Sequence, residues 1–150
     1  MYYIEAIEES KKTPKPYIFL AGGITNCPDW QQEVRKGLED LEFSLFNPRR
    51  ENFPINKPSA SYYQIKWEYN RLQLSDLITY WFAKETIQPI VLYELGKFMD
   101  SNYDILIGIH PEYPRKQDVE IQTGLARPEF KFVYSLNDHI QQIRDYIINY

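Results

Sequence analysis

The residue best placed for chemistry is Glu94, a carboxylate inside the almost wholly apolar stretch Pro89-Ile-Val-Leu-Tyr-Glu-Leu-Gly96. In that setting the side chain either points into a cleft or is paired with a buried base. Burial raises the pKa of a carboxyl group, whereas a helix N-terminus lowers it. A carboxylate so placed can attack the anomeric carbon of a sugar, as in retaining glycosidases. The alternative is a structural ion pair with Lys97 or Arg71, and the pattern does not separate the two.

A glycine pair and a helical triad offer binding groups. Ala21-Gly22-Gly23-Ile24 lies between an apolar run and a helix, so its backbone can approach a ligand closely. It lacks the glycine spacing of a dinucleotide fingerprint or a P-loop, and a plain turn is the alternative. Gln64, Trp67 and Glu68 are three or four residues apart and share one helix face. They can stack on a base and read its edge, or Trp67 can be a core anchor with polar neighbours.

Other polar side chains have strong structural alternatives. Asp76 lies where a helix meets a strand, and its alternative role is to cap the start of that strand. Arg49 and Arg50 can hold a 5′-phosphate, or form a solvated surface pair. His110 and His139 are far apart in the sequence and lack partners at ligand spacing, so no metal site is predicted.

Hydrophobic patterns predict the elements that position these residues. Apolar runs indicate buried parallel strands at residues 17–21, 43–46, 76–82, 104–109 and 131–134. Helical spacing and capping signals indicate helices at residues 28–41, 59–75, 89–100, 118–126 and 137–149. Residues 2–7 are expected to form an edge strand, residues 11–16 a linker and residues 49–58 a polar loop.

Two of these helices have a recognisable apolar face. Burial is predicted in the 28–41 helix for Trp30, Val34, Leu38 and Leu41. It is predicted in the 59–75 helix for Tyr62, Ile65, Tyr69 and Leu72.

Strands that alternate with helices indicate βαβ units, and therefore one α/β domain over residues 1–150, a three-layer sandwich with a mostly parallel five-stranded sheet. Ligands of such sheets bind outside the carboxyl ends of the strands, where the strand order reverses. The start of the 89–100 helix opens onto the same edge. The residues expected at this edge are Gly22, Gly23, Asn47, Arg49, Trp81, Phe82 and His110.

Composition excludes several classes of protein. The chain has 150 residues, 43% hydrophobic and 25% charged, which is the balance of a globular domain. Its net charge of −4 argues against a nucleic-acid binder. The one cysteine, Cys27, excludes an intramolecular disulfide and a thiolate metal site. Residues 1–12 are too polar for a signal peptide, and no apolar run has the length of a membrane span, so we expect a cytoplasmic protein without membrane contact.

Seven short motifs follow one another along residues 17–118. They are Ile18-Phe-Leu-Ala-Gly-Gly-Ile24, Asp29-Trp30-Gln31, Asn47-Pro-Arg-Arg50, Gln64-x-x-Trp67-Glu68, Asp76-Leu-Ile-Thr-Tyr-Trp-Phe82, Pro89-Ile-x-Leu-Tyr-Glu-Leu-Gly96 and Tyr113-Pro-Arg-Lys116. In order and spacing this set resembles the nucleoside 2-deoxyribosyltransferase-like family, a divergent branch of the nucleoside deoxyribosyltransferases. Each motif alone is weak, and the set is specific.

The resemblance implies a flavodoxin-like, Rossmann-like fold and cleavage of an N-glycosidic bond without a cofactor. Glu94 occupies the place of the glutamate that attacks the anomeric carbon and forms a glycosyl-enzyme, which a second base then resolves. The Gly22-Gly23 turn would lie beneath the sugar and base. The transferases carry an aspartate six residues before the nucleophile, and it holds the sugar hydroxyls. Gln88 stands there in this chain and can bind a hydroxyl without supplying negative charge.

The resemblance leaves the proton donor to the leaving base open between Asp29, Glu68 and Asp76. Asp76 is kept with Glu94 as a catalytic candidate, although it lies at the amino end of its strand. The expected substrate-binding residues are Gly22, Gly23, Ile24, Asp29, Trp30, Asn47, Arg49, Gln64, Trp67, Glu68, Trp81 and Gln88.

Three functions are weighed. The first is transfer or hydrolysis at the N-glycosidic bond of a nucleoside or nucleotide through Glu94. The second is a non-catalytic nucleotide-binding or sensing module, which Gln88 in place of the aspartate favours. The third is cleavage of NAD at its nicotinamide bond. The resemblance also implies a homo-oligomer, for which Tyr146 and Tyr150 would suit a contact.

Overall fold

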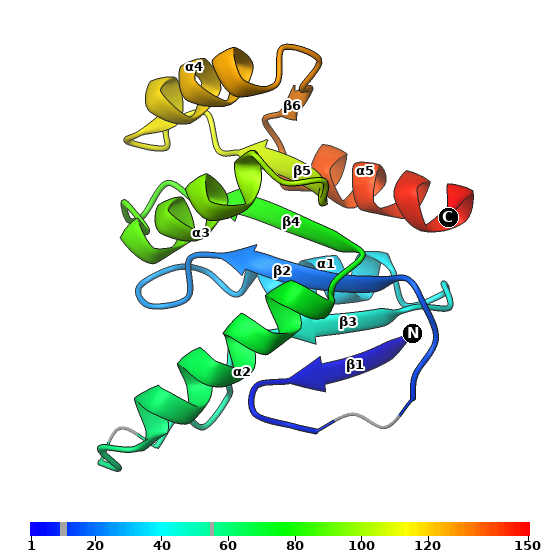
Figure 1. Cartoon of the computed structure of the whole chain (residues 1–150), viewed down its shortest axis with the longest axis vertical. Coiled ribbons are helices and arrows are strands. Elements are labelled where there is room, and N and C mark those ends of the chain that lie inside the picture. Colours follow the sequence, from blue (N-terminus) through cyan, green and yellow to red (C-terminus); the bar gives the residue numbers. More distant parts are fainter. Residues whose placement is uncertain (10–11, 55) are drawn as a thin grey trace.

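A six-stranded, all-parallel sheet lies between two layers of helices in the computed structural model, which describes residues 1–9, 12–54 and 56–150 (Figure 1). The first position of the expected 11–16 linker and position 55 of the expected 49–58 loop lie outside the described residues. The strands are β1 (Tyr2–Glu5), β2 (Tyr17–Gly22), β3 (Ser44–Asn47), β4 (Leu77–Phe82), β5 (Asp104–Ile109) and β6 (Phe132–Val133).

The spatial order of the strands is β1-β3-β2-β4-β5-β6. Without β1 this is the flavodoxin-like order, so the expected fold is confirmed and the strand order reverses between β2 and β4. The sheet has six strands instead of five. The reason is that β1 pairs in parallel with β3, with Tyr2 opposite Ser44, and buries Ile4 beneath the helices.

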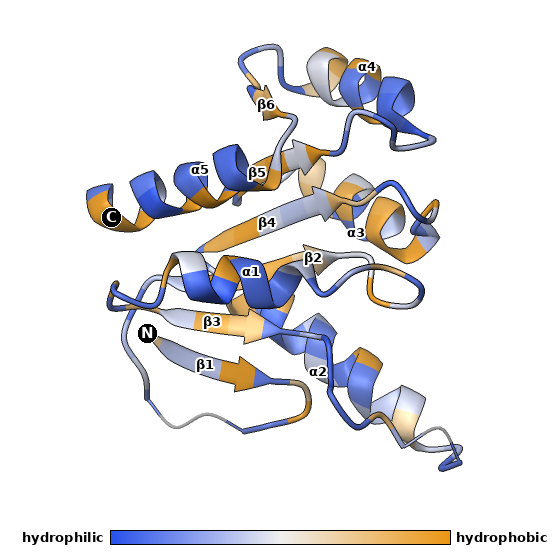
Figure 2. Ribbon diagram, turned by 180° about the vertical axis from the view of Figure 1, so that it is seen from behind, coloured by the Kyte–Doolittle hydropathy of each residue, from blue (hydrophilic) through white to orange (hydrophobic). Residues whose placement is uncertain are grey.

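The two faces of the sheet are covered by different helices, α1 and α5 on one side and α2, α3 and α4 on the other (Figures 1 and 2). The helices are α1 (Trp30–Gly37), α2 (Ala60–Leu74), α3 (Pro89–Met99), α4 (Lys116–Ala126) and α5 (Leu136–Asn149). Alternate residues of β4 serve the two layers. Ile78, Tyr80 and Phe82 pack towards α2 and α3, whereas Leu77 and Trp81 pack towards α1 and α5. Within the described residues, no helix combines the length and apolar character needed to cross a membrane.

The expected buried face of α1 is confirmed, with Leu41 only half-buried, and the helix ends earlier, at Gly37. The helix α2 buries Leu72 as expected, but the prediction is wrong for the other three residues of its expected face. Its buried residues are Ala60, Trp67 and Leu72, while Tyr62, Ile65 and Tyr69 are 63%, 64% and 52% exposed. The N-terminal part of α2 extends past the edge of the sheet (Figure 1). Tyr69, farther along the helix, has Nζ of Lys97 over its ring at 4.5 Å. The homo-oligomer stays a prediction. Of the two tyrosines expected at its contact, Tyr146 donates a hydrogen bond to Asp104 within the chain, and Tyr150 is exposed.

His139 of α5 is a buried titratable group under the sheet. Its Nε2 lies 2.6 Å from Oγ1 of Thr79, and its ring packs on Trp81. Burial lowers the pKa of His139 to about 3. An unfolded histidine has a pKa near 6.5, so below that pH the unfolded chain binds a proton that the folded chain does not. As the pH is lowered from about 6.5 to about 3, the contribution of His139 to the free energy of unfolding therefore falls by about 1.4 kcal/mol for each pH unit.

We expect His139→Gln to be less stable than the wild type at pH 7.5, with a gap about 2 kcal/mol smaller at pH 5. Chemical denaturation of both proteins at the two pH values measures the gap. Glu94 titrates with the opposite sign, but it is present in both proteins and cancels in the difference. His110→Gln, at a half-buried position past β5, should keep the pH dependence of the wild type. A stability difference between wild type and His139→Gln that is the same at both pH values would contradict the lowered pKa of His139.

Candidate active site

A cavity of about 450 Å³ opens at the carboxyl ends of β2 and β4, where the strand order reverses. Its walls are the loop after β2, the loop before α3 and the first turns of α3. Glu68 comes from α2 and Glu94 from α3, and the described lining contains no Lys or Arg. The cavity therefore brings two carboxyl groups together without a cation to neutralise them.

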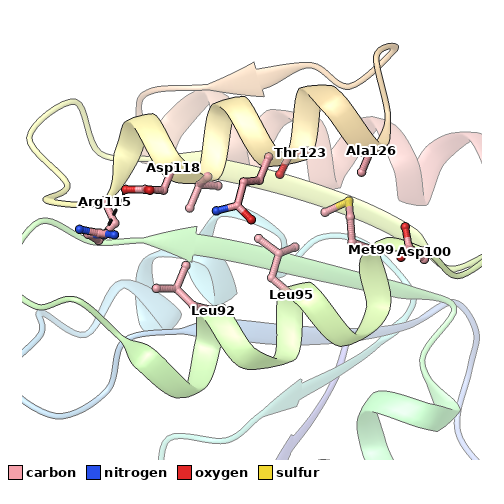
Figure 3. A pocket seen from close by; sticks show the side chains of 11 residues that line it. Leu92, Leu95, Met99, Asp100, Arg115, Asp118, Thr123 and Ala126 are labelled. Carbon is pink, nitrogen blue, oxygen red and sulfur yellow. Dashed lines mark ion pairs between the residues drawn. The ribbon is translucent and has the colours of Figure 1, made fainter.

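A second cavity of about 420 Å³ lies between α3 and α4, on the other side of α3 (Figure 3). It is lined largely by aliphatic side chains such as Leu92, Leu95 and Met99. Its one cation, Arg115, is paired with Asp118, with Nε and Oδ2 3.1 Å apart. This charge is already paired, and none of the described lining residues has a buried side-chain N or O atom without a partner or a positive φ. The cavity at the strand ends is therefore the better candidate for chemistry.

The pKa values of both carboxyl groups in the first cavity are raised. Burial is the main cause that raises the pKa of Glu94 to about 7, the charge of Glu68 raises it further, and Lys97 opposes them. Burial also raises the pKa of Glu68, and a hydrogen bond from Gln64 opposes that rise. Glu94 forms no ion pair within the described chain, so the structural ion pair considered for it is absent there. At neutral pH the pair can hold one proton between its two carboxyl groups.

Tyr80 is a buried neighbour of Glu94 that the sequence patterns did not single out. Its hydroxyl is buried and has no hydrogen-bond partner among the described residues. Burial raises the pKa of Tyr80 well above its usual value, and the nearby charge of Glu94 adds to this rise. The alternation of side chains along β4 is the signal that could have found it, because Tyr80 points to the same layer as α3.

The Gly22-Gly23 turn forms the floor of the cavity, and no larger residue fits at either position. A Cβ at Gly22 would lie 2.6 Å from the carbonyl oxygen of Trp81, and a Cβ at Gly23 would lie 2.9 Å from Cδ of Gln88. Trp30 holds the turn from below, with its Nε1 donating to the Gly23 carbonyl at 3.0 Å. A ligand above the turn therefore meets bare backbone.

Gln88 precedes α3 with φ of 55°, a left-handed conformation that is uncommon outside glycine. The residue lines the cavity, yet it is only 5% exposed. Its Nε2 donates to the carbonyl of Ala83 at 2.7 Å, which fixes the orientation of the amide. Its Oε1 is buried without a hydrogen-bond donor among the described residues. Buried acceptors are rarely left unpaired, so this oxygen suits a hydroxyl of a ligand.

A family model described as nucleoside 2-deoxyribosyltransferase like matches residues 15–113, two thirds of the chain and the whole lining of the cavity. The chain belongs to this family. No curated protein matches it. Membership in the nucleoside 2-deoxyribosyltransferase-like family confirms the resemblance and suggests glycosyl transfer at nucleosides.

Of the site residues predicted for this family member, the structure brings six together around the cavity. They are Gly22, Gly23, Ile24, Glu68, Gln88 and Glu94. Two expected residues lie behind the wall instead. Asn47 donates to the Tyr3 hydroxyl at 2.6 Å, and Asp29 caps α1 by accepting from the backbone of Gln32.

Arg49 lies beside the cavity, but its guanidinium is already occupied. Nη2 donates to the carbonyls of Ile24 and Cys27, at 2.7 and 2.9 Å, and Nη1 lies 3.5 Å from Asp29. These contacts hold the loop after β2 in place. Arg49 therefore anchors the loop after β2, a role that differs from both the phosphate contact and the solvated surface pair considered from the sequence.

The remaining tryptophans of the predicted site are core residues. Trp67 packs on Phe19 and Phe46 and donates to the carbonyl of Glu8 at 2.9 Å. Trp81 lies on the opposite face of the sheet, against His139.

Asp76 lies at the amino end of β4, the opposite edge of the sheet from Glu94. It accepts from the backbone N–H of Tyr17 at 2.8 Å and pairs with Lys15 at 2.7 Å. This is the capping role weighed as its alternative, and the geometry separates Asp76 from the cavity.

Several lining residues were missed by the sequence analysis. Thr25 and Asn26 follow the glycine turn, and Thr86 and Ile87 precede α3. The rule that ligands meet the loops after the strands could have found all four, because they lie directly past β2 and β4. Among the described residues, no group of three His, Cys, Asp or Glu side chains is arranged to hold a metal ion.

Proposed function

We propose that the protein cleaves or transfers the N-glycosidic bond of a nucleoside, with Glu94 as nucleophile and Glu68 as proton donor. The observation that carries the proposal is the pair of half-buried carboxyl groups in one cation-free cavity at the strand switch point. Family membership supports the reaction class.

In the proposed first step, a carboxylate oxygen of Glu94 attacks C1′ and the bond from C1′ to the base breaks. The bonding electrons leave with the base, which takes a proton from Glu68. The product is a glycosyl ester on Glu94. A second base, or water, then gives a proton to Glu68 and attacks C1′, which frees Glu94.

The pair favours a singly protonated state, because two neighbouring carboxyl groups resist being ionised together. Its proton rests mainly on Glu94, whose pKa of about 7 is raised by burial and by the charge of Glu68. The reaction proceeds from the form in which this proton has moved to Glu68 and Glu94 is ionised. Glu68 is preferred to Asp29 and Asp76 as donor, because only Glu68 shares the cavity with Glu94.

The lining favours an uncharged nucleoside over a nucleotide. A phosphate group would bring negative charge to a wall that already holds two carboxyl groups and no described cation, and Arg49 is engaged by the loop carbonyls. The Oε1 of Gln88, buried and without a donor among the described residues, is the acceptor that we assign to a sugar hydroxyl, in place of the aspartate that the transferases carry.

A non-catalytic nucleoside-binding or sensing module is the second candidate. The specific observation in its favour is Gln88, whose fixed, neutral amide offers a binding contact without the charge of the aspartate. Such a module would bind the same ligands without turnover.

The test is chromatographic detection of free base after incubation with deoxynucleosides, ribonucleosides, deoxynucleotides and NAD, each with and without a second base. We expect base release from a nucleoside, and a new nucleoside in the samples with a second base would show transfer. Release from NAD alone would favour a glycohydrolase. Thermal stabilisation by a nucleoside, without release from any substrate, would overturn catalysis and leave the binding module.

A further inference from the structure

Gln64 lies on α2 one turn before Glu68 and uses its amide nitrogen twice. Nε2 donates to Oε1 of Glu68 at 2.6 Å and to the carbonyl of Pro48 at 2.7 Å. Pro48 follows β3 and lines the cavity. The amide of Gln64 therefore ties one carboxyl oxygen of Glu68 to the end of a sheet strand.

The orientation of this amide is determined by its neighbours. The Pro48 carbonyl can only accept, so the nitrogen and not the oxygen of Gln64 must face it. The amide oxygen, Oε1, is buried and has no hydrogen-bond partner among the described residues. With Pro48 holding the nitrogen in place, the second N–H of the amide is presented to Glu68.

We propose that Gln64 is a positioning residue that holds Glu68 in the orientation needed to protonate the leaving base. The inference rests on the proposed function of Glu68 and Glu94. Gln64 acts through Glu68 and does not contact the substrate, which differs from the base-reading role that its spacing with Trp67 suggested. Both N–H groups are used inside the protein, so none is left for a base edge.

The charged and titratable groups around Glu68 define what a change at Gln64 should do. Glu94 of α3 lines the same cavity as Glu68. Lys97 of α3 lowers the pKa of Glu94, and the charge of Glu94 raises the pKa of Tyr80 of β4. The N–H of Gln64 favours the ionised form of Glu68 and lowers its pKa against the effect of burial. Loss of that donor should raise the pKa of Glu68, and a carboxylate at position 64 should raise it more.

The experiment compares the full chain with Gln64→Met and Gln64→Glu, with Gln73→Met as an exposed control on the same helix. Carbon NMR of glutamate side chains gives the pKa of Glu68 in each protein. Nucleoside cleavage as a function of pH gives kcat, KM and the alkaline limit of kcat/KM, where Glu68 loses its proton.

We expect the pKa of Glu68 to rise in the order wild type, Gln64→Met, Gln64→Glu, with the alkaline limit moving the same way. In Gln64→Met, kcat should fall about tenfold with KM little changed, because orientation and not binding is lost. The Gln73→Met variant should match the wild type in every measurement. An unchanged Glu68 pKa, or an unchanged kcat in a folded Gln64→Met protein, would overturn the inference.

Failure of the proposed function is distinguishable from failure of this inference. If the wild type itself releases no base, the reaction is wrong. The NMR titration still shows whether Gln64 controls the ionisation of Glu68, since it needs no turnover. A merely structural role for Gln64 would lower stability without the ordered shift in the pKa of Glu68.

Discussion

Base release should fall by at least about a thousandfold in Glu94→Gln, while nucleoside binding persists. The amide has the shape of the carboxylate but cannot form a glycosyl ester, so the first step is lost and the cavity is kept. Burial and Glu68 both disfavour the charged form of Glu94. Removing this charge should therefore leave the protein at least as stable as the wild type above about pH 7, and the loss of activity cannot be assigned to unfolding.

Chromatography of free base measures turnover, and thermal shift with the same nucleoside measures binding. Glu33→Gln, a matched change on the exposed face of α1, should behave as the wild type. If Glu94→Gln retained more than a tenth of the wild-type rate, Glu94 would not be the nucleophile. If the variant lost binding together with turnover, Glu94 would act chiefly in holding the ligand.

The architecture was largely readable from the sequence because its signals are local. Apolar runs gave the strands from β2 to β5 within one or two residues, and the glycine pair and Pro89 identified the two loops that form the cavity. Glu94 stood out because a carboxylate in an apolar helix start is unusual. The pairing of β1 with β3 was not readable from its four residues, because it depends on contacts distant in sequence.

Residue type was a poor guide to which polar side chains face the ligand. Trp30 and Trp67 follow the expected motifs, yet both rings serve the core and use their N–H groups on backbone carbonyls. Arg49 is at the right strand end, but only the folded loop shows that two carbonyls occupy its guanidinium. The carbonyl groups that bind these side chains belong to other parts of the chain, so the spacing of residues within one element cannot predict them.

The exposed face of α2 shows a second limit. Tyr62, Ile65 and Tyr69 have the spacing of a buried stripe, and periodicity detects a stripe without saying what covers it. In this chain the helix extends beyond the sheet, and the side that meets the core is set by Trp67 and Leu72. The three exposed side chains would suit the homo-oligomer implied by the family resemblance.

The second large effect is expected in Glu68→Gln, and its size should depend on the leaving group. A neutral base needs a proton as it leaves, so kcat for an ordinary nucleoside should fall about a hundredfold or more. A 7-methylguanine nucleoside carries a positive charge on its base, which leaves as a neutral molecule without protonation. Its cleavage should fall by less than about tenfold, because Glu94 is still present to attack C1′.

The same variant should change the pH dependence in a defined direction. The negative charge of Glu68 raises the pKa of Glu94, so its removal lowers that pKa. Carbon NMR of the glutamate side chains should therefore show the pKa of Glu94 about one unit lower than in the wild type. The alkaline limit of kcat/KM set by Glu68 should disappear. Equal losses on both substrates would show that Glu68 shapes the cavity without donating the proton. An unmoved pKa of Glu94 would show that the two carboxyl groups do not interact electrostatically.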